Sequence, residues 1–151
     1  MCHNNTLLCF QNINILLKLK RGLFMKVSEI MNPVIFTVEG EKSIYAAFKL
    51  MHEKGIRRVF VTVNERIEGI ISYRDLVNVL FNKGVFELID MQLKDIFTKE
   101  ILTISDSAEV EHAAQLMLHA DVSGLLVLDS KNDPLGVVSQ TDILRALVKG
   151  V

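Results

Sequence analysis

Cysteine is scarce in this sequence, and charge of neither sign is in excess. The 151 residues include two cysteines, Cys2 and Cys9, both near the N-terminus. The remainder has no disulfide framework and no thiolate for a zinc site or for nucleophilic catalysis. Lysine and arginine number 17 against 18 acidic residues, which makes the net charge −1. Because such a chain has no global basic field, we do not expect nucleic acid as a partner.

Motifs for catalysis are missing as well. The sequence has no Gly-x-x-x-x-Gly-Lys-Ser/Thr loop, so ATP hydrolysis by a P-loop is not supported. His112 and His119 are spaced two helical turns apart, but no matched cluster of carboxylates or cysteines accompanies them. We therefore predict that the protein has no metal site and no catalytic residue, and that it is not an enzyme.

Residues 1–24 differ from the rest of the chain. They carry Lys18, Lys20 and Arg21 and no acidic residue, so residues 25–151 hold 14 basic and 18 acidic side chains, a net charge of −4. Their apolar stretch is too short and interrupted to span a bilayer, and a signal peptide fits poorly. Two interpretations stay open: an extension that precedes a natural start at Met25, or an amphipathic helix on a membrane surface. We expect no membrane span and a cytoplasmic location.

Residues 25–151 contain one pattern twice. A shift of 66 residues places residues 27–63 on residues 93–129, and one inserted residue then changes the shift to 67. Each copy shows a short extended stretch, an amphipathic helix, two β-rich runs and a final helix. We predict an α/β (α+β) fold of two pseudo-symmetric β-α-β-β-α repeats. Since neither copy can bury a large core alone, we expect them to pack sheet to sheet and share one core.

Serines and apolar spacing set the expected element boundaries. In the first copy, the spacing predicts a helix over residues 44–54 that Ser43 caps. In the second copy, we expect Ser107 or Ser105 to open the matching helix. The final helices are expected to begin near Arg74 and Thr141.

A Gly-x-x-Ser-x-x-Asp tail joins the second β-rich run of each copy to its final helix, at residues 69–75 and 136–142. In a structural interpretation, the serine caps the helix and the aspartate complements its positive end. In a ligand-binding interpretation, free N–H groups at the helix start bind phosphate and the carboxylate accepts hydrogen bonds from ribose hydroxyls. The sequence leaves both interpretations open.

The element order, the two copies and the repeated tail together resemble tandem cystathionine-β-synthase-type (CBS) domains, a Bateman module. The resemblance implies an extension at 1–24, repeat 1 at 25–82, a linker at 83–92 and repeat 2 at 93–151. Such modules commonly bind adenosine-containing ligands, so it implies a regulatory sensor without catalysis that needs no cofactor and acts on an unidentified protein. The implied ligand is AMP, ADP or ATP, with S-adenosylmethionine as an alternative. A structural or interaction pair with empty clefts, or a nucleic-acid binder, is the alternative function.

The resemblance also implies two clefts, each of which joins the tail of one copy to early-strand and second-strand residues of the other. Cleft A ranks first for phosphorylated adenosine because Arg57 and Arg58 supply cations. In the alternative interpretation, these two arginines bind no ligand and form a solvated edge. Cleft B has Arg74 as its one cation for a phosphate group. We therefore expect it to bind phosphorylated adenosine more weakly than cleft A, to bind a less charged adenosine derivative, or to stay empty. Cleft A comprises Val34, Ile35, Ile56, Arg57, Arg58, Ser139, Thr141 and Asp142. Cleft B comprises Ser72, Arg74, Asp75, Ile101, Leu102, Val122, Ser123 and Gly124.

A homodimer of CBS pairs is a further implication of the resemblance. The linker segment at residues 81–91 is expected to pack across the joint between the two modules. The helices expected to pair the modules carry Ala47 and Met51, Ala113 and Met117, Leu76 and Leu80, and Leu144 and Leu147.

Overall fold

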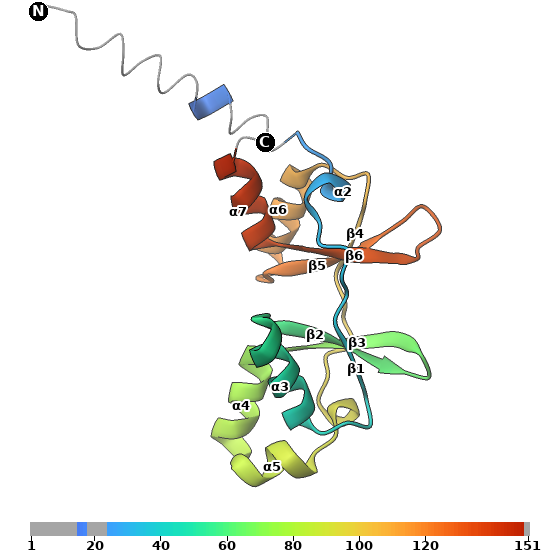
Figure 1. Cartoon of the computed structure of the whole chain (residues 1–151), viewed down its shortest axis with the longest axis vertical. Helices are drawn as coiled ribbons and strands as arrows, with labels where there is room; N and C mark the ends of the chain where they lie inside the picture. Colours follow the sequence, from blue (N-terminus) through green and yellow to red (C-terminus); the bar gives the residue numbers. More distant parts are fainter. Residues whose placement is uncertain (1–14, 18–23, 150–151) are drawn as a thin grey trace, which may run out of the picture. The chain divides into compact units, whose positions relative to one another are not determined.

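The computed structural model describes residues 15–17 and 24–149 (Figure 1). The chain divides into two compact units, each described here by itself. Of the described residues, unit 1 combines those up to residue 34 with residues 102–149, and unit 2 comprises residues 35–101. The expectations for residues 1–24 lie almost wholly outside the described residues. Within the described ranges, no helix has the length and apolar character needed to cross a membrane.

Unit 2 contains a three-stranded sheet in the order β1-β2-β3. Strand β1 pairs parallel with β2, and β2 pairs antiparallel with β3. The turn between β2 and β3 uses Asn64 and Glu65, both with positive φ, as a tight reversal requires. The elements of unit 2 are β1 (Thr37–Glu39), α3 (Ile44–Lys54), β2 (Arg58–Val63), β3 (Arg66–Ser72), α4 (Tyr73–Lys83), α5 (Val85–Asp90) and the 3-10 helix η1 (Leu93–Asp95).

Unit 1 repeats this arrangement with a sheet in the order β4-β5-β6. Strand β4 pairs parallel with β5, and β5 pairs antiparallel with β6. The predicted mixed fold with two copies of one element order is therefore confirmed. The elements of unit 1 are α2 (Val27–Ile30), β4 (Thr103–Ser105), α6 (Val110–His119), β5 (Gly124–Leu128), β6 (Pro134–Ser139) and α7 (Gln140–Lys149).

The starts of α3 and α6 differ from the sequence prediction. Helix α3 has the predicted bounds, but the side chain of Ser43 makes no capping hydrogen bond. Helix α6 has Glu109 at its N-cap, so the prediction of a serine cap was wrong. At both helix starts the first helical amide bonds to a segment distant in sequence: Ile44 N donates to the carbonyl of Met91, and Val110 N donates to the carbonyl of Met25.

Each unit contains the leading segment of the other repeat. Helix α2 precedes the first repeat's strands but lies in unit 1, where Val27 N donates to the carbonyl of Ala108 at 2.8 Å. Likewise, η1 precedes the second repeat's strands but lies in unit 2, where Leu93 N donates to the carbonyl of Lys42 at 2.9 Å. The boundaries of the compact units therefore differ from those of the sequence repeats.

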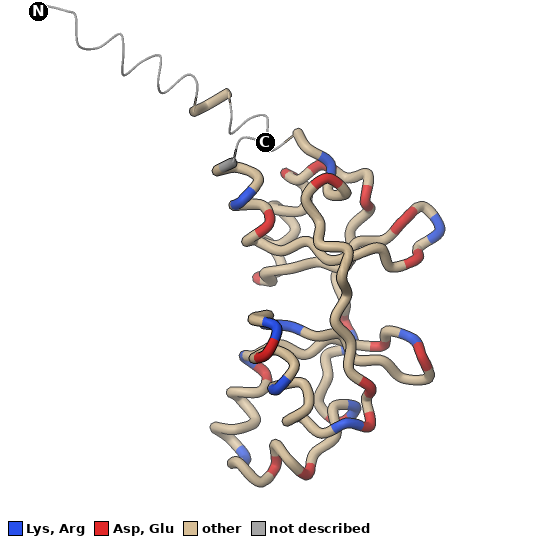
Figure 2. The backbone as a smooth tube through the Cα atoms, viewed as in Figure 1, with Lys and Arg blue, Asp and Glu red and all other residues tan. Residues whose placement is uncertain are grey.

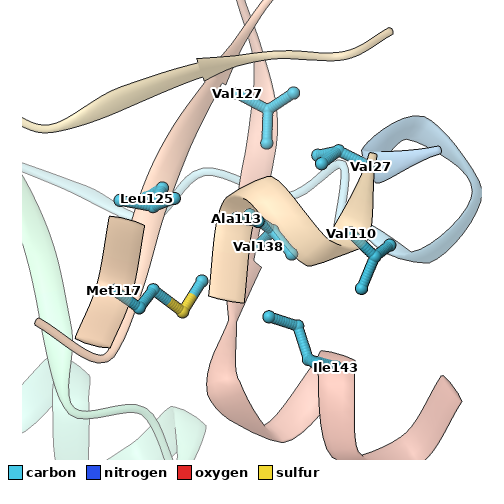
Figure 3. Close-up of a cluster of buried hydrophobic side chains, with 8 residues drawn as sticks. All are labelled: Val27, Val110, Ala113, Met117, Leu125, Val127, Val138 and Ile143. Atoms are coloured by element: carbon cyan, nitrogen blue, oxygen red, sulfur yellow. The ribbon is translucent and has the colours of Figure 1, made fainter. Parts of the chain in front are cut away.

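The buried residues form two clusters, one in each unit. Figure 3 shows the unit 1 cluster between α2, α6, α7 and the strands. Val27 and Leu93, the two exchanged residues, are fully buried, and burial of such a side chain contributes about 1.5–3 kcal/mol. The unit 1 cluster comprises Val27, Val110, Ala113, Met117, Leu125, Val127, Val138 and Ile143. The unit 2 cluster comprises Ile44, Ala47, Met51, Val59, Val61, Ile71, Leu76 and Leu93.

Several residues that mark the helices expected to pair two modules are enclosed within their own units. Ala47, Met51, Leu76, Ala113 and Met117 are buried in the cores of their own units. A side chain enclosed in this way has no surface left to offer to a second module. A contact between modules would have to use other residues of these helices.

Candidate ligand-binding site

The two tails place the same hydrogen-bonded pair at the starts of α4 and α7. In unit 2, Ser72 N and Ser72 Oγ both donate to Asp75 Oδ2, at 2.8 and 2.6 Å, and Asp75 N donates back to Ser72 Oγ at 3.3 Å. In unit 1, Ser139 and Asp142 repeat these bonds at 2.8, 2.5 and 3.3 Å. The structural interpretation, a reciprocal cap, is therefore present in both units. Each serine hydroxyl donates to its own aspartate, so in this arrangement it positions the carboxylate and does not donate to a phosphate.

Fixing one carboxylate oxygen still leaves the other as an acceptor. The bonds from Ser139 both end on Asp142 Oδ2, whereas Asp142 Oδ1 lies 3.6 Å from Arg145 Nη1. That ion pair is weak, because the Arg145 side chain is 67% exposed. The Asp142 side chain itself is only 17% exposed. A partly buried carboxylate held in one orientation is suited to accept a pair of hydroxyl hydrogen bonds.

The glycine that opens each tail marks a close contact with the exchanged segment. A Cβ atom on Gly136 would clash with the carbonyl oxygen of Asn32, and a Cβ atom on Gly69 would clash with the ring of Phe97. In the sequence, these two glycines are recognisable only as the first residues of the repeated Gly-x-x-Ser-x-x-Asp tail. Their physical role is to let the leading segment of the other repeat pack against the strand that ends at the Ser–Asp pair.

Unit 2 gathers three arginines around its tail. Arg58 pairs with Ser72 in the β2–β3 ladder, the carbonyl of Arg57 accepts a 2.8 Å bond from Tyr73 N, and Arg74 lies in the first turn of α4. Burial lowers the pKa of the Arg58 guanidinium, and the charges of Arg57 and Arg74 lower it further, while Asp75 raises it. The charges of Arg57, Arg74 and Asp75 thus all act on the Arg58 guanidinium.

Unit 1 has the same backbone geometry without the arginines. Gly124 pairs with Ser139 in the β5–β6 ladder, as Arg58 pairs with Ser72. Gln140 N donates to the carbonyl of Ser123 at 3.1 Å, as Tyr73 N donates to that of Arg57. With Thr141 in the position of Arg74, the unit 1 counterparts of all three arginines are uncharged.

The residues predicted for each cleft are distributed over both units. From cleft A, unit 1 holds Val34, Ser139, Thr141 and Asp142, and unit 2 holds Ile35, Ile56, Arg57 and Arg58. From cleft B, unit 1 holds Leu102, Val122, Ser123 and Gly124, and unit 2 holds Ser72, Arg74, Asp75 and Ile101. Arg74 was predicted for a different cleft from Arg57 and Arg58, and all three residues lie in unit 2.

In the part of the chain that the structure describes, no three histidine, cysteine, aspartate or glutamate side chains lie together in a way that could hold a metal ion.

Comparison with known protein families identifies the class. The CBS domain model matches residues 27–82 and 93–149, and the chain therefore belongs to the CBS-domain family. A CBS domain-containing protein of Dictyostelium discoideum is 31% identical over 132 residues, which cover 82% of this chain and 91% of that protein. The chain spans only 40% and 46% of the uncharacterised relatives that it matches in Methanocaldococcus jannaschii and Thermofilum pendens.

Solved structures share the fold. A CBS domain pair in complex with 5′-methylthioadenosine and S-adenosyl-L-methionine matches with a TM-score of 0.74 at 22% identity, over 85% of this chain and 99% of that one. The CBS-pair protein CBSX2 of Arabidopsis thaliana, in complex with AMP, matches with a TM-score of 0.70 at 25% identity. That match covers 82% of this chain and 96% of the other. Both likenesses are to paired CBS domains.

Proposed function

We propose that this chain is a cytoplasmic regulatory module that binds an adenosine-containing ligand and changes its partner or dimer interactions without catalysis. The observation that carries the proposal is the duplicated Ser–Asp pair, which holds a carboxylate in one orientation at the starts of α4 and α7. The CBS pairs solved with AMP, and with S-adenosyl-L-methionine and 5′-methylthioadenosine, support this class of ligand. AMP, ADP and ATP are the proposed ligands, with S-adenosylmethionine as the alternative.

In this proposal the aspartates bind ribose. Asp75 and Asp142 each have one oxygen fixed by a serine, so the other can accept hydrogen bonds from the two ribose hydroxyls. Arg57 and Arg58 would neutralise phosphate in cleft A, which stays the preferred site. A ligand that contacts residues of both units would favour one conformation of the chain over another. It can do so only to the extent that it binds that conformation more tightly.

The proposed readout is a regulated protein or a homodimer. The last helix of each repeat carries exposed apolar side chains at matching positions: Val77 and Phe81 in α4, and Leu144 and Val148 in α7. Such exposure on a repeated helix face favours a symmetric protein contact. Helix α5 adds Val85, Phe86 and Ile89, which are also exposed. These residues replace the buried ones as the proposed contact surface.

Calorimetric titration with AMP, ADP, ATP and S-adenosylmethionine tests the proposal. Asp75→Asn and Asp142→Asn retain an acceptor for the serine amide but lose the charge and one strong acceptor. We expect at least one ligand to bind, and at least one variant to weaken that binding tenfold or more. Glu65→Gln, in the β2–β3 turn, is the matched control and should bind as the unaltered chain does.

Two outcomes would overturn the proposal. Absence of binding for all four ligands up to millimolar concentration would favour a purely structural or interaction module. Unchanged affinity in both aspartate variants, with unfolding transitions like that of the unaltered chain, would remove the aspartates from the site.

A further inference from the structure

The two Ser–Asp pairs differ in the residue that lies one turn further along each helix. We infer that Arg145, in α7, competes with the ribose of the ligand for Asp142 and thereby weakens adenosine binding at the unit 1 tail. This inference rests on the proposed function, in which Asp142 binds ribose. The residue at the corresponding position of α4 is Asn78, which carries no charge. Arg145 therefore sets the affinity of one tail only, and makes that affinity depend on ionic strength.

Helical spacing brings Arg145 to Asp142. Residues three apart are neighbours on a helix surface, and Asp142 lies in the first turn of α7. Figure 2 shows acidic and basic segments next to each other along this helix. Arg145 Nη1 is 3.6 Å from Asp142 Oδ1, which is an ion-pair distance and longer than a hydrogen bond. The guanidinium is therefore attracted to this oxygen without being fixed to it.

The oxygen that faces Arg145 is also the one that remains for ribose. Ser139 donates from both its N and its Oγ to Asp142 Oδ2, and each carboxylate oxygen accepts about two hydrogen bonds. The ribose hydroxyls would therefore bind at Oδ1. Because the Asp142 side chain is only 17% exposed, little of its carboxylate can be reached from solvent. Arg145 and a ribose consequently need the same small accessible surface.

Burial of the carboxylate distinguishes this ion pair from ordinary surface pairs. Two other ion pairs within the described residues, both in unit 2, join side chains that are all more than half exposed. A carboxylate in such a pair has free surface at which a further partner can bind. Asp142 has little, because Ser139 engages one oxygen and the protein covers most of the side chain. Here the ion pair controls access to the acceptor as well as contributing to the helix.

The competition is weak and can be screened by salt. The Arg145 side chain is 67% exposed, and an exposed ion pair of this kind should lower the adenosine affinity by a factor of about two to five. Salt reduces the range of the attraction from about 30 Å at 0.01 M to about 3 Å at 1 M. Adenosine has no net charge, so added salt should tighten its binding at Asp142 by releasing Arg145.

Adenosine titration in an Asp75→Asn background tests the unit 1 tail by itself. At low salt, we expect Arg145→Gln to raise the adenosine affinity about two- to fivefold. Without Arg145→Gln, the affinity should rise between about 0.01 and 1 M sodium chloride, and Arg145→Gln should reduce that rise. Lys131→Gln is the matched control, because it also removes an exposed cation from unit 1, in the β5–β6 turn. This control should leave the affinity and its salt dependence unchanged.

Asn78→Arg transfers the arrangement to unit 2. Asn78 is exposed and follows Asp75 by three residues, as Arg145 follows Asp142. In an Asp142→Asn background, Asn78→Arg should weaken adenosine binding about two- to fivefold at low salt. Asn78→Gln keeps the position uncharged and should leave the affinity unchanged. An arginine that only stabilised its own helix would not carry this effect to the other tail.

The outcomes separate the competition from the proposed function. Adenosine binding that neither Arg145→Gln nor Asn78→Arg alters would overturn the competition and leave the proposed function standing. The competition would also be overturned by an equal effect of Lys131→Gln, which indicates net charge as the cause, or by weaker binding in Arg145→Gln, which indicates a contact with the ligand. If Asp75→Asn alone abolished binding, Asp142 would bind no ribose and the competition would be wrong. Absence of adenosine binding in the unaltered chain and in every variant would overturn the adenosine proposal and the competition together.

Discussion

Asn32 and Val137 come from different sequence repeats, yet they exchange two backbone hydrogen bonds of 2.8 Å. Thr98 and Ile70 form the corresponding pair in unit 2, with bonds of 2.9 and 3.0 Å. In each unit, the strand that ends at the Ser–Asp pair is therefore flanked by the leading segment of the other repeat. The geometry of each candidate ligand-binding carboxylate consequently depends on both repeats.

Gly136→Ala tests the close approach at this bridge. The added Cβ would clash with the carbonyl oxygen of Asn32, a backbone atom that cannot rotate away. We expect urea unfolding to show a loss of about 1–3 kcal/mol, as overpacking usually causes. Gly55→Ala is the comparison, because its Cβ would meet nothing within 4 Å and only its left-handed backbone is strained, at a cost of about 1 kcal/mol. Equal stability of the two variants would refute the steric explanation.

Ser72→Ala tests the cap at the start of α4. It removes the hydroxyl that accepts from Asp75 N and donates to the Asp75 carboxylate, so we expect a loss of about 1 kcal/mol in unfolding free energy. Ser43→Ala is the matched control, because Ser43 stands at the N-cap of α3 without a side-chain capping bond. That variant should stay within about 0.5 kcal/mol of the unaltered chain. Similar losses in both would contradict the structural assignment.

Fragments test the exchange of leading segments. Residues 35–101 contain all of unit 2, including the fully buried Leu93. Residues 25–92 contain the first repeat but lack Leu93 and Phe97. We expect a cooperative thermal transition by circular dichroism for the first fragment, and a weaker, less cooperative one for the second. The reverse order of stability would show that the sequence repeat, and not the compact unit, is the folding unit.

Phe81→Ser combined with Phe86→Ser tests the proposed dimer surface. Phe81 and Phe86 are 89% and 81% exposed, so the double variant should keep its fold while losing apolar contact area. In sedimentation velocity, we expect the unaltered chain to be dimeric and the variant to be monomeric. Leu118→Ser, which alters a 76% exposed residue of α6, should remain dimeric. A monomeric unaltered chain, or a variant that stays dimeric, would rule out this surface.

Local patterns predicted much of the fold. Apolar spacing over residues 44–54 defined α3 correctly, because its buried face follows the helical period. The repeated tail predicted both Ser–Asp pairs, since a reciprocal cap involves residues only three apart. The serine caps predicted for α3 and α6 are absent, and the first amides of these helices bond to the remote carbonyls of Met91 and Met25. Nothing in the local sequence indicates these two long-range bonds.

The sequence by itself determined the duplication, the order of elements and the carboxylate at the start of each final helix, because all three depend on short-range periodicity and spacing. Only the tertiary structure decided that each core is completed by the other repeat's leading segment, through Val27 and Leu93. It also decided that the charges of Arg57, Arg74 and Asp75 all act on Arg58, which lies opposite Ser72 in the β2–β3 ladder. Both results depend on pairing between distant segments, where backbone hydrogen bonds and burial choose among arrangements that local patterns leave equivalent.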